Sequence, residues 1–167
     1  MLAKSCLYLK TWAQRHGLYG QQNGFPSGLG FSCMAIFAAQ CLEPPAADHV
    51  LEVPELLDIS HVHQLREREK TNVEDLSRIV HGIFLFYADV FDWDAEQVSP
   101  RLGRRQLRPA RSADKVLSIE DPVLPDLDLA RPYMNPARSG ELRRAFLRTC
   151  DLLAQGKWEA AWKPALS

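Results

Sequence analysis

The fold is decided by residues 8–31, YLKTWAQRHGLYGQQNGFPSGLGF. This stretch joins two helical patterns of different character. The first, over residues 2–16, places apolar side chains on one helical face: Leu2, Cys6, Leu9 and Ala13. Gly17 is expected to end that helix, and a loop with three glycines follows over residues 17–27. The second pattern, over residues 27–42, is apolar nearly all the way round, which is typical of a buried helix.

Further helices are predicted toward the C-terminus. Residues 43–71 hold three prolines and little periodicity, and we interpret them as a surface linker. Residues 72–90 form the clearest helix, with apolar side chains three and four residues apart: Val73, Leu76, Val80, Ile83, Tyr87 and Val90. Asn135 and Pro136 begin a C-terminal helical segment over residues 136–163. Because only Val98 and Ser99 suggest a strand, we predict a mainly α single domain, residues 1–167, with at most a short β-hairpin.

Composition narrows the classes of partner. The 167 residues are 46% hydrophobic, which is enough for one domain with a sizeable core. A net charge of -1 gives no overall attraction to nucleic acid, so such a contact requires a local basic patch. The densest basic run supplies three candidate RNA contacts, Arg101, Arg104 and Arg105, although a solvated basic loop explains it equally well.

The cysteines and the hydropathy pattern bear on the compartment. None of the four cysteines forms a Cys-x-x-Cys pair, which indicates reduced thiols in an intracellular protein. No apolar run reaches the roughly 18 residues that cross a bilayer, and the N-terminus lacks the order of a signal peptide. We therefore expect an intracellular protein with no membrane partner, and DNA is not an expected partner.

One group of residues suggests an anion site. Lys10 lies at the edge of the apolar face of its helix, Tyr19 lies in the following loop, and small residues surround the next helix start, Ser27 to Gly30. Backbone N–H groups at a helix start, together with the helix dipole, favour a bound anion such as a phosphate. The alternative is a lysine that reaches out of the core, a core tyrosine and a serine cap. The residues alone leave both interpretations open.

Two acidic pairs have the spacing of metal-binding carboxylates but an unsuitable context. Asp92 and Asp94, like Asp126 and Asp128, stand in turn-rich loops with no glycine-serine helix before them. We therefore predict no catalytic residue and no metal ligand in this chain. The tryptophans Trp12, Trp158 and Trp162 are expected to be packing residues.

Residues 8–31 resemble the central-domain wall of the ATP pocket in poly(A) polymerases, members of the DNA polymerase beta-like nucleotidyltransferase superfamily that also includes terminal uridylyltransferases. The matching residues are Lys10, Trp12, Ala13, Tyr19, Gly24, Phe25 and Gly28. The resemblance implies that Lys10 and Tyr19 contact the triphosphate and that Gly28 and Leu29 lie against the base. Gln21 stands where nuclear-type enzymes place a base-contacting asparagine. Residues 1–42 are thus expected to be the nucleotide-wall helices, that is, the helices that form the central-domain wall of the nucleotide pocket.

A second match covers the poly(A) polymerase-associated region, expected over residues 72–135. Its marker positions are Tyr87, Phe91, Asp92, Val98 and Ser99, followed by the Ile119 to Pro122 run, IEDP, that opens a base-reading loop in these enzymes. The resemblance implies that Asp121 supports base recognition, with Arg131 shaping the pocket. Leu127 replaces the histidine that selects uracil in uridylyltransferases. Gln14, Gly28 and Leu29 also depart from the uridylyltransferase pattern, so ATP is the expected substrate.

The family's catalytic carboxylates belong to a separate domain that precedes the Lys-x-Trp-Ala helix, and no such motif precedes residue 8. We therefore expect the central, nucleotide-recognition domain of an RNA 3′-end nucleotidyltransferase adding AMP from ATP, inactive on its own. Its expected partners are an RNA 3′ end and a catalytic domain, through which alone Mg²⁺ or Mn²⁺ would act. The alternatives are a non-catalytic RNA- or protein-binding module, a terminal uridylyltransferase fragment and, more distantly, a 2′-5′ oligoadenylate synthetase.

Overall fold

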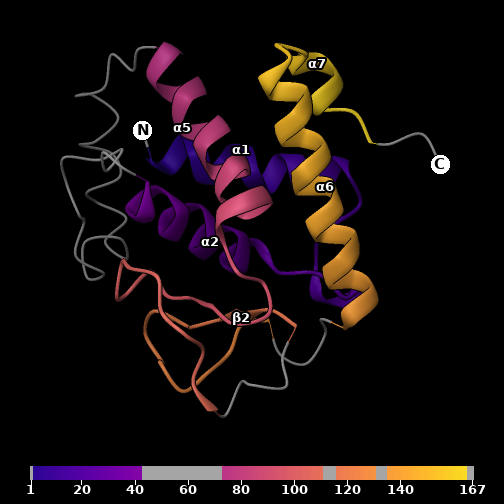
Figure 1. The fold of residues 1–167 in the computed structure, drawn as a ribbon. Coiled ribbons are helices and arrows are strands. Elements are labelled where there is room, and N and C mark those ends of the chain that lie inside the picture. Colours follow the sequence, from indigo (N-terminus) through magenta and orange to yellow (C-terminus); the bar gives the residue numbers. More distant parts are fainter. Residues whose placement is uncertain (1, 43–72, 111–115, 131–134, 165–167) are drawn as a thin grey trace.

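The computed structural model describes residues 2–42, 73–110, 116–130 and 135–164, and the predicted mainly α architecture is confirmed there. The long helices are α1 (Leu2–Arg15), α2 (Gly28–Cys41), α5 (Val73–Leu85) and α6 (Pro136–Ala154). Three short helical segments are η1 (Gln21–Asn23), η2 (Phe86–Val90) and α7 (Trp158–Ala161). Figure 1 shows the helices packed together above a less regular region that holds the strands. The predicted linker, residues 43–71, and Arg131 lie outside the described residues.

The strand region differs from the prediction in one respect. Strands β1 (Gln97–Val98) and β2 (Ser118–Ile119) pair in parallel, with Gln97 opposite Ser118, so they do not form a hairpin. Parallel neighbours need a long connection, and here the basic run after β1 lies within that connection. Two isolated antiparallel bridges, Glu96 with Leu107 and Glu120 with Asp128, extend the pairing.

Aromatic side chains fill the core between the helices. Most of the largest fully buried side chains come from α1, α2, α5, η2 and α6, and they include Trp12, Phe31, Phe37, Phe84, Phe86, Tyr87 and Phe146. The indole N–H of Trp12 donates to Thr149 Oγ1 at 3.0 Å, and the Tyr87 hydroxyl donates to the Met34 carbonyl at 2.8 Å. Both polar groups are therefore satisfied inside an apolar core, which avoids the free-energy penalty of a buried unpaired donor.

The predicted helix over residues 72–90 ends in a wider turn. Residues Phe86–Val90 form a π-helix, closed by the Phe91 N–H donating to the Phe86 carbonyl at 2.8 Å. The wider turn accompanies three buried rings, Phe86, Tyr87 and Phe91, which contact one another edge to face or tilted.

Within the described residues, no helix has the length and apolar character that crossing a membrane requires.

The cysteines are free in this structure. Burial raises the pKa of Cys6 and of Cys41 to about 11 and that of Cys33 to about 12. Thiols with such pKa values stay protonated near neutral pH and react slowly, since the thiolate is the nucleophile. We therefore assign these cysteines to packing.

Candidate functional site

Three predicted site residues meet at the start of α2. A Cβ atom built on Gly28 would lie 2.6 Å from the Tyr19 hydroxyl oxygen and 3.7 Å from Lys10 Cδ. The side chains of Lys10 and Tyr19 therefore both lie over the first residue of the helix, and both are only partly exposed. The structure thus brings together residues that the sequence places in a helix, a loop and a second helix.

The loop between α1 and α2 holds Tyr19 in place through glycine geometry and ring packing. Gly20 has a φ of 92°, a backbone conformation that side chains disfavour, and its N–H donates to the Pro26 carbonyl at 3.0 Å. The Tyr19 ring stacks on Phe31 with centroids 6.0 Å apart and an interplanar angle of 8°. Because Phe31 is fully buried, the stacked Tyr19 ring is held against the core, and the position of its hydroxyl is set by that packing.

The start of α2 offers unpaired donors. Ser27 is the N-cap, and its Oγ accepts from the Gly30 N–H at 3.3 Å. No described residue accepts a hydrogen bond from the N–H of Gly28 or of Leu29. Two backbone donors thus remain at the positive end of a helix dipole, beside the Lys10 side chain. This arrangement suits an anion with several oxygens.

Strand β2 brings the Asp121 loop against the same helix. A Cβ atom on Gly30 would lie 3.6 Å from Ile119 Cδ1, so the absence of a side chain lets the strand approach the first turn of α2. The negative charge of Asp121 adds to burial in raising the pKa of Cys33, which lies one turn after Leu29 on α2. Strand β2 therefore lies against the first turn of α2, and the Asp121 loop follows directly from that strand.

The Asp121 side chain itself organises this loop. Its Oδ1 accepts from the N–H groups of Val123 at 2.9 Å and Leu124 at 3.0 Å, and its own N–H donates to the Leu127 carbonyl at 3.0 Å. These bonds close residues 121–127 into a compact turn that projects apolar side chains outward. Val123 is 57% exposed, Leu124 is 60% exposed and Leu127 is 47% exposed.

Leu29 and Gln21 lie at the margin of this site. Leu29 is 49% exposed in the first turn of α2, so its side chain is available to a ligand above that helix. Gln21 opens η1 and is partly exposed, and no described residue bonds to its side chain. Gln21 is thus close to Tyr19 in sequence, but no hydrogen bond links its side chain to the other described site residues.

Two of the three candidate RNA-contacting arginines are engaged in ion pairs. Arg101 Nη2 lies 2.7 Å from Glu120 Oε1, and Arg105 Nε lies 2.8 Å from Glu96 Oε1. Glu120 is buried and also accepts a hydrogen bond from the Ser99 hydroxyl. Arg104 is exposed and has no such partner among the described residues. Arg101 and Arg105 therefore hold the strand region together, and sequence alone gave no sign of the buried carboxylates that they bind.

In each acidic pair, one carboxylate accepts hydrogen bonds from backbone N–H groups. Asp92 Oδ1 accepts from the N–H groups of Asp94 and Ala95, at 2.9 and 3.1 Å. Asp128 accepts from the Ser118 hydroxyl and from the N–H of Ile119, at 2.9 and 3.0 Å. No group of three or more potential metal ligands occurs within the parts of the chain that the structure describes.

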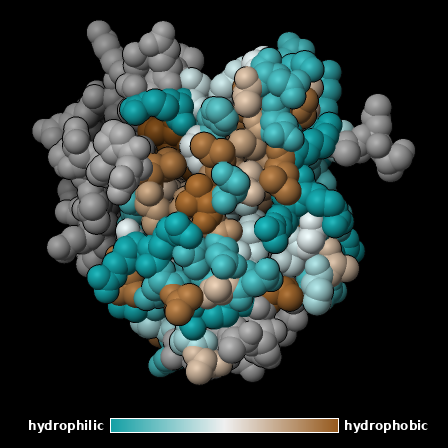
Figure 2. All heavy atoms as spheres, viewed as in Figure 1, coloured by the Kyte–Doolittle hydropathy of each residue, from teal (hydrophilic) through white to brown (hydrophobic). Residues whose placement is uncertain are grey.

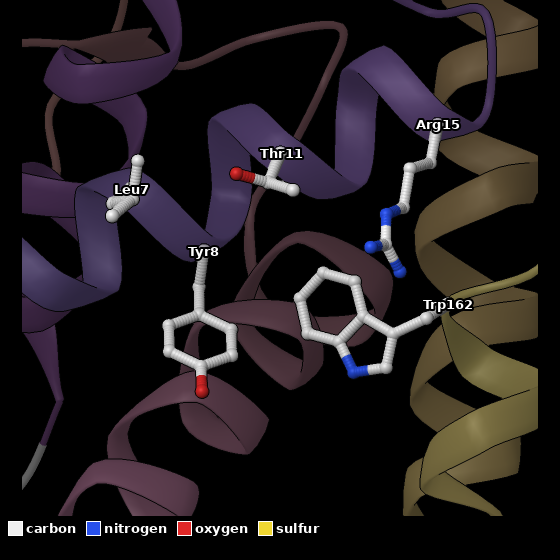
Figure 3. A pocket seen from close by; sticks show the side chains of 5 residues that line it. All are labelled: Leu7, Tyr8, Thr11, Arg15 and Trp162. Atoms are coloured by element: carbon white, nitrogen blue, oxygen red, sulfur yellow. The ribbon is translucent and has the colours of Figure 1, made fainter.

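The sequence interpretation missed a second surface feature. Leu7, Tyr8, Thr11, Arg15 and Trp162 line a pocket of about 380 Å³ between α1 and the end of α7 (Figure 3). Of the three tryptophans expected to be packing residues, Trp12 lies in the core and Trp162 packs against the core while also lining this pocket, whereas Trp158 is 37% exposed.

Comparisons with known proteins identify the fold. No protein-family model and no curated protein matches the sequence. A mutant Cid1 poly(U) polymerase bound to MgATP matches 98% of this chain with a TM-score of 0.77 and 21% identity. A cytoplasmic RNA terminal U-transferase matches 99% of it with a TM-score of 0.74 and 20% identity. An mtPAP mutant in complex with ATPgammaS matches 98% of it with a TM-score of 0.74 and 19% identity.

The matched chains are longer than this one. The present chain spans 55% of the Cid1 chain, 58% of the terminal U-transferase chain and 39% of the mtPAP chain. At such identities the likeness establishes a shared fold. The chain therefore has the helical fold found in these RNA-tailing nucleotidyltransferase structures.

Proposed function

We propose, with this shared fold as the premise, that the chain is the nucleotide-recognising part of an RNA 3′-end nucleotidyltransferase that adds AMP from ATP. The observation that carries the proposal is the meeting of Lys10, Tyr19 and Gly28 at the start of α2. Fold alone does not assign function, so the proposal rests on the chemistry of that site.

The site supplies complementary groups for a triphosphate. The Lys10 ammonium contributes a full positive charge, and the N–H groups of Gly28 and Leu29 contribute oriented dipoles at a helix start. The Tyr19 hydroxyl adds a donor whose direction is held by the stack on Phe31. Charge-assisted hydrogen bonds of this kind stabilise bound phosphate by about 1.5–3 kcal/mol each.

The base would lie between the start of α2 and the loop of residues 121–127. Leu29 presents an exposed aliphatic surface on one side, and the loop presents Leu127 on the other. These side chains offer apolar contact to the flat face of a base. Neither offers a hydrogen bond to its edge, and discrimination in favour of uracil would require one.

The surroundings of Gly28 also support ATP over UTP. The resemblance places a serine at this position in uridylyltransferases, yet a Cβ atom here would lie 2.6 Å from the Tyr19 hydroxyl oxygen. A serine would therefore require a different position for Tyr19. The side-chain arrangement around α2 is matched to glycine and so favours the adenylate-adding alternative over the uridylyltransferase one.

The chemistry of transfer needs groups beyond those described. In two-metal nucleotidyl transfer, Mg²⁺ or Mn²⁺ activates the attacking hydroxyl and stabilises charge on the phosphate. The described residues hold no carboxylate cluster for such ions, so we assign them to a catalytic domain that acts with this one. In that arrangement Lys10 and Tyr19 hold the triphosphate while the RNA 3′ end approaches from the catalytic side.

Exposed apolar side chains argue against a self-sufficient binding module. Leu29, Leu124 and Leu127 are each about half exposed or more beside the proposed nucleotide site. Exposed apolar clusters of this kind mark surfaces that contact a ligand or another domain. A catalytic domain closing over the nucleotide would cover them, which favours the enzyme interpretation.

The proposal is tested by isothermal titration of the full chain with ATP and with UTP. We expect saturable ATP binding that is several-fold tighter than UTP binding, because no side chain at position 127 bonds a uracil edge. Absence of ATP binding at millimolar concentration, or tighter binding of UTP, would contradict it.

A further inference from the structure

A second site opens on the face of α1 that points away from the core. The buried positions of α1 are Ser5, Leu9, Trp12 and Ala13, whereas Leu7 and Tyr8 are 60% and 39% exposed. The pocket of about 380 Å³ lies on this outer face, with Trp162 closing it from the end of α7 (Figure 3). This volume lies within the range of small-ligand pockets and fits one nucleotide unit.

Two aromatic rings line the pocket. Tyr8 and Trp162 have ring centroids 5.3 Å apart and an interplanar angle of 52°, so they make an open aromatic corner. Both rings are partly exposed, which leaves apolar faces in contact with water. A flat heterocycle laid on such a surface removes those faces from water, and stacking on an aromatic side chain stabilises each nucleic-acid base substantially.

The lining of the pocket carries one positive charge. Arg15 is the charged member of the lining, and Figure 3 shows its guanidinium directed toward the Trp162 ring. Arg15 makes no ion pair within the described residues. On the neighbouring helix α6, Arg148 donates to the Lys163 carbonyl at 3.2 Å, directly after Trp162. A ligand with a ring and one negative charge therefore matches this pocket.

We propose that the pocket binds one nucleotide of single-stranded RNA, with the base on Tyr8 and Trp162 and a phosphate on Arg15. Thr11 lies between Tyr8 and Arg15 on the same helix and supplies a hydroxyl within the pocket (Figure 3). One guanidinium suits the single charge of a phosphodiester better than a triphosphate. The choice of RNA as the source of this nucleotide rests on the proposed function. Lys10 is not part of this lining, so the two sites are separate.

The tryptophans provide a specific reporter. The chain has four, of which Trp12 and Trp93 are 0% and 2% exposed in the core. In the variant Trp158→Phe, Trp162 is therefore the sole tryptophan that a ligand can reach. We would titrate this variant with an oligo(A) RNA of about 12 nucleotides, a length within the site sizes of single-strand binding proteins. The expected result is saturable quenching of Trp162 fluorescence, which disappears in Trp158→Phe/Trp162→Phe.

Three comparisons separate stacking on the pocket from general charge attraction. An abasic strand of equal length keeps its phosphates, and we expect it to give little quenching. Arg15→Gln should weaken oligo(A) binding by roughly tenfold. Arg143→Gln, which removes an exposed arginine of α6 outside the pocket, should leave it nearly unchanged. Far-UV circular dichroism and thermal unfolding of each variant verify that it is folded.

Further outcomes distinguish this proposal from the nucleotide-wall proposal. Lys10→Ala should weaken ATP binding by roughly tenfold or more and leave oligo(A) quenching intact. Tyr8→Ala should weaken oligo(A) quenching and leave ATP binding intact. Oligo(A) that fails to quench Trp162, or an abasic strand that quenches equally, would overturn the pocket proposal and leave the ATP site standing. Free AMP that binds as tightly as oligo(A) would overturn the assignment to an RNA strand.

Discussion

The Tyr19 hydroxyl lies where a side chain at position 28 would begin, 2.6 Å from the place of a Cβ atom on Gly28. The next nearest atom of Tyr19, its ring Cζ, is 3.7 Å from that place, which is an ordinary contact distance. The conflict therefore concerns one oxygen atom. The Tyr19 ring is stacked on buried Phe31, so the oxygen is not free to move aside without disturbing that packing.

Gly28→Ala should destabilise the chain in the presence of the Tyr19 hydroxyl and not in its absence. We expect a lower Tm in Gly28→Ala, because crowding costs about 1–3 kcal/mol in a packed site. In a Tyr19→Phe background the same substitution should leave Tm unchanged or raise it, since alanine favours a helix over glycine. Differential scanning calorimetry of the four proteins measures this coupling.

The matched control for this cycle is Gly140→Ala. Gly140 lies in α6, where a Cβ atom would approach only Arg144 Nη1, at the end of a flexible side chain. Its substitution should raise Tm slightly in both backgrounds. Equal effects of Gly28→Ala with and without the Tyr19 hydroxyl would contradict the geometry described here.

Lys10→Ala should weaken ATP binding by roughly tenfold or more, because one charge-assisted contact to phosphate is lost. The measurement is isothermal titration with ATP at constant ionic strength. Lys157→Ala serves as the control, since it removes an equal charge from an exposed position before α7. Equal affinities of Lys10→Ala and Lys157→Ala for ATP would contradict the assignment of Lys10 to the nucleotide site.

Leu127→His should shift base preference toward UTP. Position 127 is 47% exposed at the end of the Asp121 turn, so an imidazole there can reach a ligand without disturbing the core. The expected result is a fall of several-fold in the ratio of ATP to UTP affinity, because a hydrogen bond to the uracil edge becomes available. Leu124→His, in the same loop and 60% exposed, should leave that ratio unchanged.

His16 should make the stability of the chain depend on pH. Burial lowers the pKa of His16 in the folded state, although its Nε2 contact with the Ala161 carbonyl at 3.1 Å opposes this. Since the unfolded chain binds the proton more readily, the His16 contribution is complete above the ordinary pKa of 6.5 and is lost as pH falls below it. Urea unfolding from pH 7 to pH 5 should therefore show a shallower loss of stability in His16→Gln. An identical pH profile in both proteins would refute the assignment.

The helices could be predicted from sequence because their signals are local. The spacing of Val80, Ile83 and Tyr87 predicts the buried face of α5 and η2, and the Asn135–Pro136 pair marks the first turn of α6. The approach of Lys10, Tyr19 and Gly28 was also predicted, through the resemblance of residues 8–31 to a known motif. Helical periodicity alone places Lys10 at the edge of the core and does not predict which residues it contacts.

The features that sequence did not predict depend on distant partners. The parallel pairing of β1 with β2 joins strands of two residues each, too short for a pattern to specify direction. The ion pairs of Arg101 and Arg105 require carboxylates that fold back from other segments. Tyr8 and Trp162 come from opposite ends of the described chain, and no local spacing links them.

In the turn of residues 121–127, the groups that fix the backbone differ from the side chains that are exposed. Its shape is set by backbone hydrogen bonds to Asp121, while the side chains of Val123, Leu124 and Leu127 are about half exposed or more. Substitutions at Val123, Leu124 or Leu127 can therefore accumulate without unfolding the domain. If this turn reads the base, a lineage could exchange one nucleotide preference for another through single steps, each of which leaves a folded protein for selection to act upon.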